Sequence, residues 1–261
     1  MCGRLNQYIQ LQFLSIAGRR FGFGRKRKEQ EDQRARKDFV YNICPTDYAE
    51  VLTMEDGEAV MQPMRFGLIP KWATGSKTEV WRKFMLTFNA RSETVFDLAS
   101  YRRPIRSQRC LIPVRGWHEW PDRTTPYYIH RTDDEPLLLA GIWDRWESHH
   151  LADDETGPIV TSMSIITTPP GRYMGKFHDR SPLVLDGEEA LSWLQPGVLE
   201  ADLREFMRPR DDSQLEAYRV STAANKAKNK TEEVIEAIAR PVPQGDEPML
   251  KPDTREDLQL F

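Results

Sequence analysis

Short apolar stretches fill the middle of the chain and alternate with Gly, Pro and Asp. Between residues 38 and 166 these stretches have the length and the β-branched or aromatic content of strands. The pattern predicts strands at residues 40–43, 49–54, 60–64, 109–113, 127–130, 137–142 and 162–167. No regular amphipathic helices separate these strands, so a doubly wound parallel sheet is not expected.

Helical periodicity is confined to fewer segments. It predicts helices at residues 7–17, 93–100, 187–194, 199–207 and 230–239. Together the patterns predict one α+β domain over residues 1–238, a mainly antiparallel, barrel-like sheet with flanking helices. From residue 241 to 261 the chain is polar and rich in proline, which predicts a disordered tail.

One segment of the predicted domain stands out by its charge. Residues 17–38 form a charged insertion with more Lys and Arg than Asp and Glu. A solvated helix or loop, a contact with a DNA backbone, and a nuclear address within residues 24–28 all remain open for it. The formal net charge of the chain is −3, so any DNA-binding surface must be a local basic patch.

The composition is that of a globular domain, with 39% hydrophobic and 30% charged residues. No segment approaches the roughly 18 consecutive apolar residues of a membrane span, and the first residues lack the pattern of a secretory signal. The cysteines, Cys2, Cys44 and Cys110, form no CxxC pair, which argues against disulfides and zinc. Cys44 and Cys110 lie in apolar stretches and are expected to be buried. We expect a cytoplasmic monomer that needs no metal or organic cofactor and is nucleoid-associated on DNA, or nuclear in a eukaryote.

Cys2 is the first candidate for chemistry. Removal of Met1 would place an α-amine and a thiol on adjacent carbons, both partly deprotonated near neutral pH. The amine can condense with an aldehyde, and the thiol can then close a five-membered thiazolidine ring. The alternative is that Cys2 is an incidental second residue.

Further candidates lie in polar positions beside apolar residues. Glu119 stands between two tryptophans, so burial would favour its neutral form and allow proton transfer near pH 7. His178 is flanked by charges of both signs, and Asn89 and Arg91 are separated by a single alanine. Structural roles remain open for each of them: an interfacial carboxylate, a hydrogen-bonded imidazole, a helix N-cap and an anion contact.

Taken in order, several segments of the chain resemble the SOS-response-associated peptidase (SRAP) family, whose members shield abasic sites in DNA. The matching segments are MCGR (1–4), YNICPT (41–46), FGLIPKWA (66–73), NARSET (89–94), RCLIP (109–113), GWHEW (116–120), TT (167–168) and HDRSP (178–182). The resemblance runs from residue 1 to about residue 238, and the shared order of the segments makes it specific.

The resemblance implies roles for individual residues. Cys2 would be the nucleophile, surrounded by Asn89, Glu119 and His178. Arg4, Arg91 and Thr167 match positions that hold the N-terminus or the DNA, and Trp72 would stack on a base. The chain departs from the family pattern at three positions: Phe66 replaces the usual Trp, His118 a common Tyr, and Ser181 a common Met.

These residues support three hypotheses. In the first, Cys2 captures abasic sites in single-stranded DNA as a covalent thiazolidine, which shields the lesion during the DNA damage response. In the second, Cys2 is the N-terminal nucleophile of a peptidase or autopeptidase, its own amine activating its thiol. In the third, the chain is a non-enzymatic module for single-stranded DNA, and Cys2 is incidental. The first gives the chain a cross-linking, lyase-like activity.

Overall fold

Two β-sheets make up most of the computed structural model, which describes residues 2–8, 13–16, 19–22, 39–147 and 159–245. The larger sheet contains β5 (Tyr48–Glu55), β6 (Glu58–Phe66), β8 (Arg109–Val114), β11 (Leu137–Glu147) and β12 (Ile159–Thr168). These strands pair in the order β11-β8-β5-β6-β12, and β12 pairs again with β11, so the sheet closes into a barrel. All these pairs are antiparallel except β12 with β6.

Two short strands extend the barrel at β12. Strand β7 (Asn89–Arg91) runs parallel to β12, and β13 (Ser181–Pro182) pairs with the last two residues of β12. These additions bring two distant segments, one before β8 and one after β12, to the same end of the barrel.

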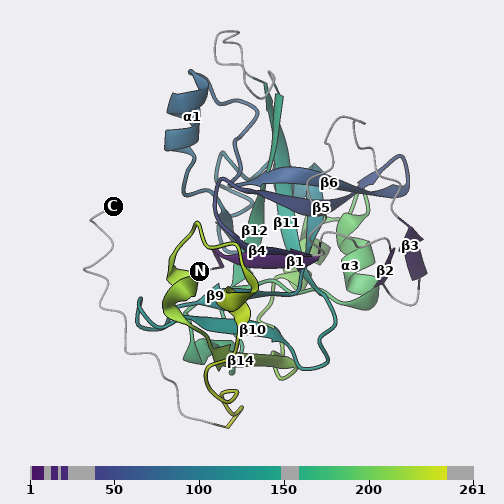
Figure 1. The fold of residues 1–261 in the computed structure, drawn as a ribbon. Coiled ribbons are helices and arrows are strands. Elements are labelled where there is room, and N and C mark those ends of the chain that lie inside the picture. Colours follow the sequence, from purple (N-terminus) through teal and green to yellow (C-terminus); the bar gives the residue numbers. More distant parts are fainter. Residues whose placement is uncertain (1, 9–12, 17–18, 23–38, 148–158, 246–261) are drawn as a thin grey trace.

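The second sheet has five antiparallel strands in the order β14-β10-β9-β1-β4. They are β1 (Leu5–Tyr8), β4 (Phe39–Ile43), β9 (Gly116–Glu119), β10 (Tyr127–Arg131) and β14 (Leu215–Arg219). Figure 1 shows this sheet below the barrel strands, with β1 and β4 nearest to them. One buried cluster takes residues from both sheets, so part of the core lies where the sheets face each other.

The predicted α+β class and the predicted strands are confirmed, since each predicted strand lies within an observed one. The helices at α3 (Gly187–Leu194) and α4 (Glu200–Phe206) are also confirmed. The capping box of Ser76 and Glu79 begins a helix that the sequence reading missed, α1 (Lys77–Lys83). A short helix, α2 (Pro104–Ser107), precedes β8.

The prediction of a helix over residues 7–17 is wrong. The chain forms β1 there, and residues 13–16 and 19–22 form the hairpin of β2 (Phe13–Ile16) and β3 (Arg19–Gly22). The polar positions of β1 face inward. Gln7 donates to the carbonyl oxygens of Glu50 and Pro113 at 2.9 and 2.8 Å, and Asn6 accepts from the Asn42 amide at 2.9 Å. The polar residues of β1 are buried because they form hydrogen bonds. The periodicity analysis treated them as exposed and therefore predicted an amphipathic helix.

Two other predicted helices are wrong. Residues 93–100 form successive turns, held at one end by the pair of Glu93 with Arg180 and at the other by Trp72, whose indole donates to Ala99 at 3.1 Å. Within residues 230–239 only the 3-10 turn η3 (Glu232–Ile235) is helical. Tertiary contacts override a weak local preference in both segments.

The end of the chain stays in contact with the domain beyond residue 238. Val242 donates its amide to Ala217 at 2.8 Å, and the side chain of Gln244 donates to Leu215 at 2.8 Å. Residues 241–245 thus run along β14, and the rest of the predicted tail lies outside the described residues. So does most of the charged insertion, of which the structure describes only 19–22.

The described helices are short, α3 having eight residues, and none of them is long and apolar enough to cross a membrane. Cys110 is fully buried, as expected. The expectation for Cys44 is wrong, because it follows β4 and is only half-buried, with the Lys230 ammonium 3.7 Å from its sulfur.

Candidate functional site around Cys2

Strand β1 fixes the position of Cys2. Leu5 lies opposite Trp117 of β9, and the His118 amide donates to the carbonyl oxygen of Arg4 at 3.0 Å. Continuing this antiparallel register places Cys2 and Gly3 beside the end of β9 that carries Glu119. The segment that precedes β1 is therefore held by backbone pairing next to a carboxylate.

Cys2 and Glu119 are both buried, each with 1% of its surface exposed. Burial raises the pKa of the Cys2 thiol well above its ordinary value, and the nearby charge of Glu119 raises it further. Both effects favour the neutral thiol, since burial and a neighbouring anion each disfavour a thiolate. The Glu119 carboxylate is thus near enough for its charge to act on the thiol.

Asn89 and Thr167 approach the same cluster from the barrel. Strands β7 and β12 pair in parallel with Asn89 opposite Ile165 and Arg91 opposite Thr167. Alternate residues of a strand share a face, and paired residues point the same way, so Asn89 and Thr167 share the face of Ile165. Ile165 belongs to the buried cluster that contains Cys2.

Glu119 and His178 are each close in sequence to a member of the same cluster. Glu119 is two residues from Trp117, a member of the cluster, and so lies on the same face of β9. His178 directly follows Phe177, another member. Cys2 thus belongs to this cluster, Asn89 and Glu119 share strand faces with two of its members, and His178 directly follows a third, although the four come from separate segments of the chain.

Two of the predicted residues carry buried polar groups that the described protein does not satisfy. Neither Nδ2 nor Oδ1 of Asn89, nor Oγ1 of Thr167, has a hydrogen-bond partner among the described residues. Leaving such groups unpaired costs about 1–3 kcal/mol each. Such groups are uncommon in folded proteins, and a bound ligand or an ordered water would supply the missing partners.

The 3-10 turn η1 (Met174–Lys176) presents His178. Its first amides are capped by Asp212, whose carboxylate accepts from Tyr173 and Met174 at 3.0 and 2.7 Å. The imidazole itself is partly exposed, and its Nδ1 lies 2.6 Å from Oδ1 of Asp179. The backbone amide of Arg180 also approaches Nδ1, at 3.0 Å.

Arg180 joins several of these segments and was missed by the sequence reading. Its guanidinium binds both carboxylate oxygens of Glu93, at 2.5 and 2.8 Å, and donates to the carbonyl oxygen of Thr167 at 2.6 Å. The hydrogen bonds from Arg180 hold the pKa of the Glu93 carboxyl below its usual value. The only sequence signal was the pair of charged residues in HDRSP and NARSET, which gave no indication that they meet.

Three other predicted residues, Arg4, Arg91 and Trp72, have different surroundings. The guanidinium of Arg4 donates to Asn42 Oδ1 at 2.8 Å and lies 5.5 Å from the centre of the Trp120 ring. Arg91 is exposed. Trp72 is 51% exposed on the loop after β6, edge-on to Phe84. Phe66, by contrast, is fully buried and presents no surface for stacking.

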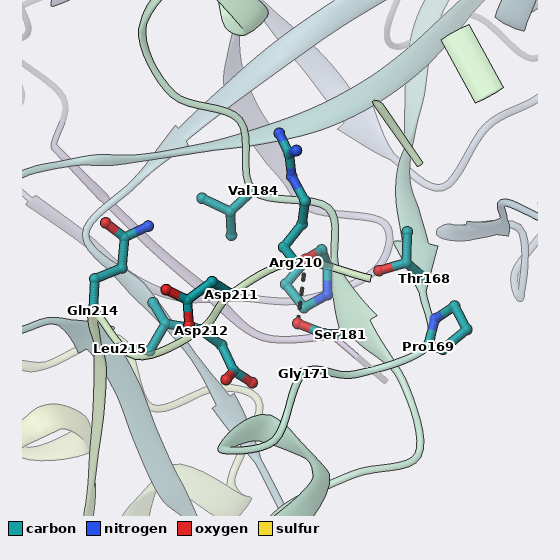
Figure 2. A pocket seen from close by; sticks show the side chains of 11 residues that line it. Thr168, Pro169, Gly171, Ser181, Val184, Arg210, Asp211, Asp212, Gln214 and Leu215 are labelled. Carbon is teal, nitrogen blue, oxygen red and sulfur yellow. Dashed lines mark hydrogen bonds between the residues drawn. The ribbon is translucent and has the colours of Figure 1, made fainter. Parts of the chain in front are cut away.

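A pocket borders the end of β12, next to Thr167. Figure 2 shows Thr168, Pro169 and Ser181 on one side of it and the segment from Arg210 to Leu215 on the other. Ser181 donates its hydroxyl to the carbonyl oxygen of Pro182 at 3.2 Å, and Arg210 pairs with Glu189. The polar groups of Ser181 and Arg210 are thus already bound. Asp212, on the other wall, caps η1 and so supports the loop that carries His178.

No cluster of three or more His, Cys, Asp or Glu side chains within the described parts of the chain could hold a metal ion. The available chemistry is that of a thiol, a carboxylate, an amide and an imidazole. A closed barrel packed against a second sheet, with a candidate site around the second residue of the chain, describes the class of protein to which this chain belongs.

Comparison with known proteins agrees with this class. The sequence profile of the SOS response associated peptidase (SRAP) family matches residues 1–227. The chain is 33% identical over 202 residues to the abasic site processing protein YoqW of Bacillus subtilis (strain 168), covering 76% of this chain and 85% of that protein. It is 29% identical to the abasic site processing protein HMCES of Xenopus tropicalis, covering 76% and 66% of the two chains.

A crystal structure of a protein from Bacteroides thetaiotaomicron has a similar fold, with a TM-score of 0.65 and 29% identity over 76% of this chain and 85% of that one. The chain belongs to the SRAP family. The residues that carried the resemblance in the sequence all lie within the matched range.

Proposed function

We propose that this chain processes abasic sites in DNA by capturing them, in single strands, as a covalent adduct of Cys2. The observation that supports the proposal is the burial of Cys2 within reach of the Glu119 charge, together with the unsatisfied amide of Asn89, whose strand partner Ile165 belongs to the same buried cluster as Cys2. The names of relatives such as YoqW and HMCES support the same substrate.

The chemistry begins once Met1 is removed. The Cys2 amine attacks the open-chain aldehyde of the abasic sugar, and the resulting carbinolamine loses water to form an imine. The thiol sulfur then adds to the imine carbon, its proton passes to the nitrogen, and a thiazolidine results. No oxidant or reductant is required, because the sum is an aldehyde plus an aminothiol giving the ring and water.

Each neighbouring residue has a role in these steps. Glu119 moves protons during ring opening of the sugar and loss of water, and it accepts the thiol proton before the ring closes. Asn89 orients the amine through its otherwise unpaired amide. His178 gives a proton to the sugar oxygen that is released as the ring opens. Thr167 offers a hydroxyl on the same face.

The DNA strand is held by groups further out. Arg91 is exposed next to the site and suits a phosphate contact, and Trp72 offers half of its surface for stacking on a base. Arg4 contributes indirectly, because its contacts with Asn42 and Trp120 hold β1 in place.

The experiment is mass spectrometry of the purified chain, alone and after incubation with a single-stranded oligonucleotide that carries one abasic site. We expect loss of Met1 and an adduct at Cys2 that survives denaturant and is absent from Cys2→Ala. Cys2→Ser should form only a reversible imine, and Glu119→Gln should slow adduct formation. A chain forced to begin at Cys2 that forms no adduct would refute the proposal.

The same measurement tests the second hypothesis, a peptidase. Self-removal of Met1 predicts that Cys2→Ala retains Met1 when the chain is made without aminopeptidases, whereas the wild type loses it. Binding of single-stranded DNA that is indifferent to both the lesion and Cys2 would favour the third hypothesis, a non-enzymatic module.

A further inference from the structure

The imidazole of His178 has two competing partners on one nitrogen. Oδ1 of Asp179 lies 2.6 Å from Nδ1, and the backbone amide of Arg180 points at the same Nδ1 from 3.0 Å. A carboxylate oxygen only accepts, whereas the amide only donates. Nδ1 can satisfy one of them at a time, and its protonation state decides which.

We propose that Asp179 is a positioning residue that keeps a proton on Nδ1 of His178, so that Nε2 delivers the proton used by the reaction. The inference rests on the proposed function and adds to it a residue and a tautomer. With Nδ1–H donated to Asp179, loss of the Nε2 proton leaves a neutral ring that keeps its hydrogen bond and its orientation.

The Arg180 amide favours the opposite tautomer. If the carboxylate of Asp179 were absent, this amide would donate to an unprotonated Nδ1, and the neutral ring would carry its proton on Nε2. The ring would then be held in nearly the same place, but with a lower affinity for the second proton that the reaction needs. Asp179 therefore controls which nitrogen of His178 carries the proton and contributes little to the stability of the fold. Its side chain is 74% exposed, which agrees with this role.

Two other charged groups near this turn, Arg180 and Lys176, are already engaged, and Arg172, before η1, is exposed. The guanidinium of Arg180 is bound to Glu93 and to the carbonyl oxygen of Thr167. The ammonium of Lys176 donates to the carbonyl oxygen of Pro243 at 2.6 Å and lies over the ring of Tyr173. Asp179 is thus the carboxylate in contact with Nδ1. Glu119, the remaining titratable side chain of the proposed site besides Cys2, is unchanged in every variant below.

The first test is a nuclear magnetic resonance experiment on the ¹⁵N-labelled full chain. Long-range correlation spectra distinguish the two tautomers of each histidine, and His178→Gln identifies the signal of His178 among the five histidines. We expect a neutral ring protonated on Nδ1 in the wild type and in Asp179→Glu, and on Nε2 in Asp179→Asn. The titration midpoint of His178 should fall by about 0.5–1 unit in Asp179→Asn, less than for a buried pair because solvent screens the contact.

The second test measures the rate of adduct formation with the abasic oligonucleotide. That shift predicts a loss of about 3–10-fold at pH 7.5 in Asp179→Asn, since one unit is a factor of ten in the protonated fraction. The loss should shrink as the pH falls and His178 becomes protonated in both proteins, and Asp179→Asn should add nothing to His178→Gln. Asp97→Asn, an exposed carboxylate on another loop, is the matched control and should leave the rate unchanged.

The outcomes separate the two proposals. Identical tautomers and midpoints in wild type and Asp179→Asn would overturn the role of Asp179, as would a rate loss that persists in the His178→Gln background. If the wild-type chain forms no adduct, the proposed function fails, and the spectra alone decide whether Asp179 fixes the proton.

Discussion

Lowering the pH from 7 to 5 should destabilise the folded chain through one buried imidazole, that of His118. The ring is fully buried, and its Nε2 lies 2.7 Å from the carbonyl oxygen of Val234. That contact requires Nε2–H. Nδ1 lies 3.4 Å from the side-chain amide of Asn6 and accepts from it, so the ring is neutral. Burial above all, helped by the positive charge of Arg4 and opposed by the hydrogen bond to Val234, lowers the pKa of His118 from 6.5 to about 4.

The magnitude follows from linkage between protonation and folding. The unfolded chain takes up a proton on this residue below about pH 6.5, whereas the folded chain does so only near pH 4, so stability is complete above pH 6.5 and is lost as the pH falls. At 1.36 kcal/mol per unit, His118 alone should reduce the free energy of unfolding by about 2 kcal/mol at pH 5 and about 3 kcal/mol at pH 4.

The assay is urea unfolding followed by tryptophan fluorescence at pH 7, 6 and 5, in the wild type and in His118→Gln. Carboxyl groups contribute to the pH dependence of both proteins, so the difference between the two isolates the histidine. Gln retains a donor and an acceptor but does not titrate. The variant should lose about 2 kcal/mol less than the wild type between pH 7 and 5, and parallel curves for the two proteins would refute the assignment of a buried neutral imidazole.

Three further predictions concern packing and DNA. Gln7→Leu removes buried hydrogen bonds to Glu50 and Pro113 and should lower the free energy of unfolding in urea by about 2–4 kcal/mol. Gln62→Leu, at a half-buried position, is the control and should lower it by less than about 1 kcal/mol. Equal losses in the two variants would contradict the anchoring of β1 by Gln7. Gly141→Ala places a Cβ 2.4 Å from Cδ1 of Ile112 and should cost about 1–3 kcal/mol. Adding Ile112→Val should recover part of that loss, and simple additivity would count against the clash. Trp72→Ala should weaken binding to single-stranded DNA by about tenfold without changing its salt dependence, as expected for a lost stacking contact; an altered salt slope in a fluorescence titration would point to a phosphate contact instead.

The success of the strand predictions and the failure at β1 have the same origin. The barrel strands β8, β11 and β12 are buried along most of their length, so their apolar runs were visible in the sequence. Strand β1 buries Asn6 and Gln7 together with Leu5, and their partners, Asn42, Glu50 and Pro113, lie far away in the chain. A periodicity argument treats polar residues as exposed, and it fails where they are satisfied inside.

The candidate site divides in the same way. Cys2, Glu119 and His178 could be predicted from the sequence, because the chemistry of each depends on its neighbours in the chain. Cys2 would carry an N-terminal aminothiol, Glu119 stands between tryptophans, and His178 stands between charged residues. The contacts of His178 with Asp179 and Arg180 are local too, yet their geometry depends on η1, which the distant Asp212 caps. No pattern indicated that Arg180 would bind Glu93.

The sequence by itself thus determined where seven of the strands lie, which residues carry reactive groups and, through the order of its segments, the family. Those strands are β4, β5, β6, β8, β10, β11 and β12. Only the tertiary structure decided that β7 pairs with β12, that β1 lies against β9, and that Asn89 and Glu119 share strand faces with members of the cluster that contains Cys2. The reason is physical: local preferences act over a few residues. The site is made by pairings between segments about a hundred residues apart, whose free energy comes from burial and hydrogen bonds that exist only in the folded chain.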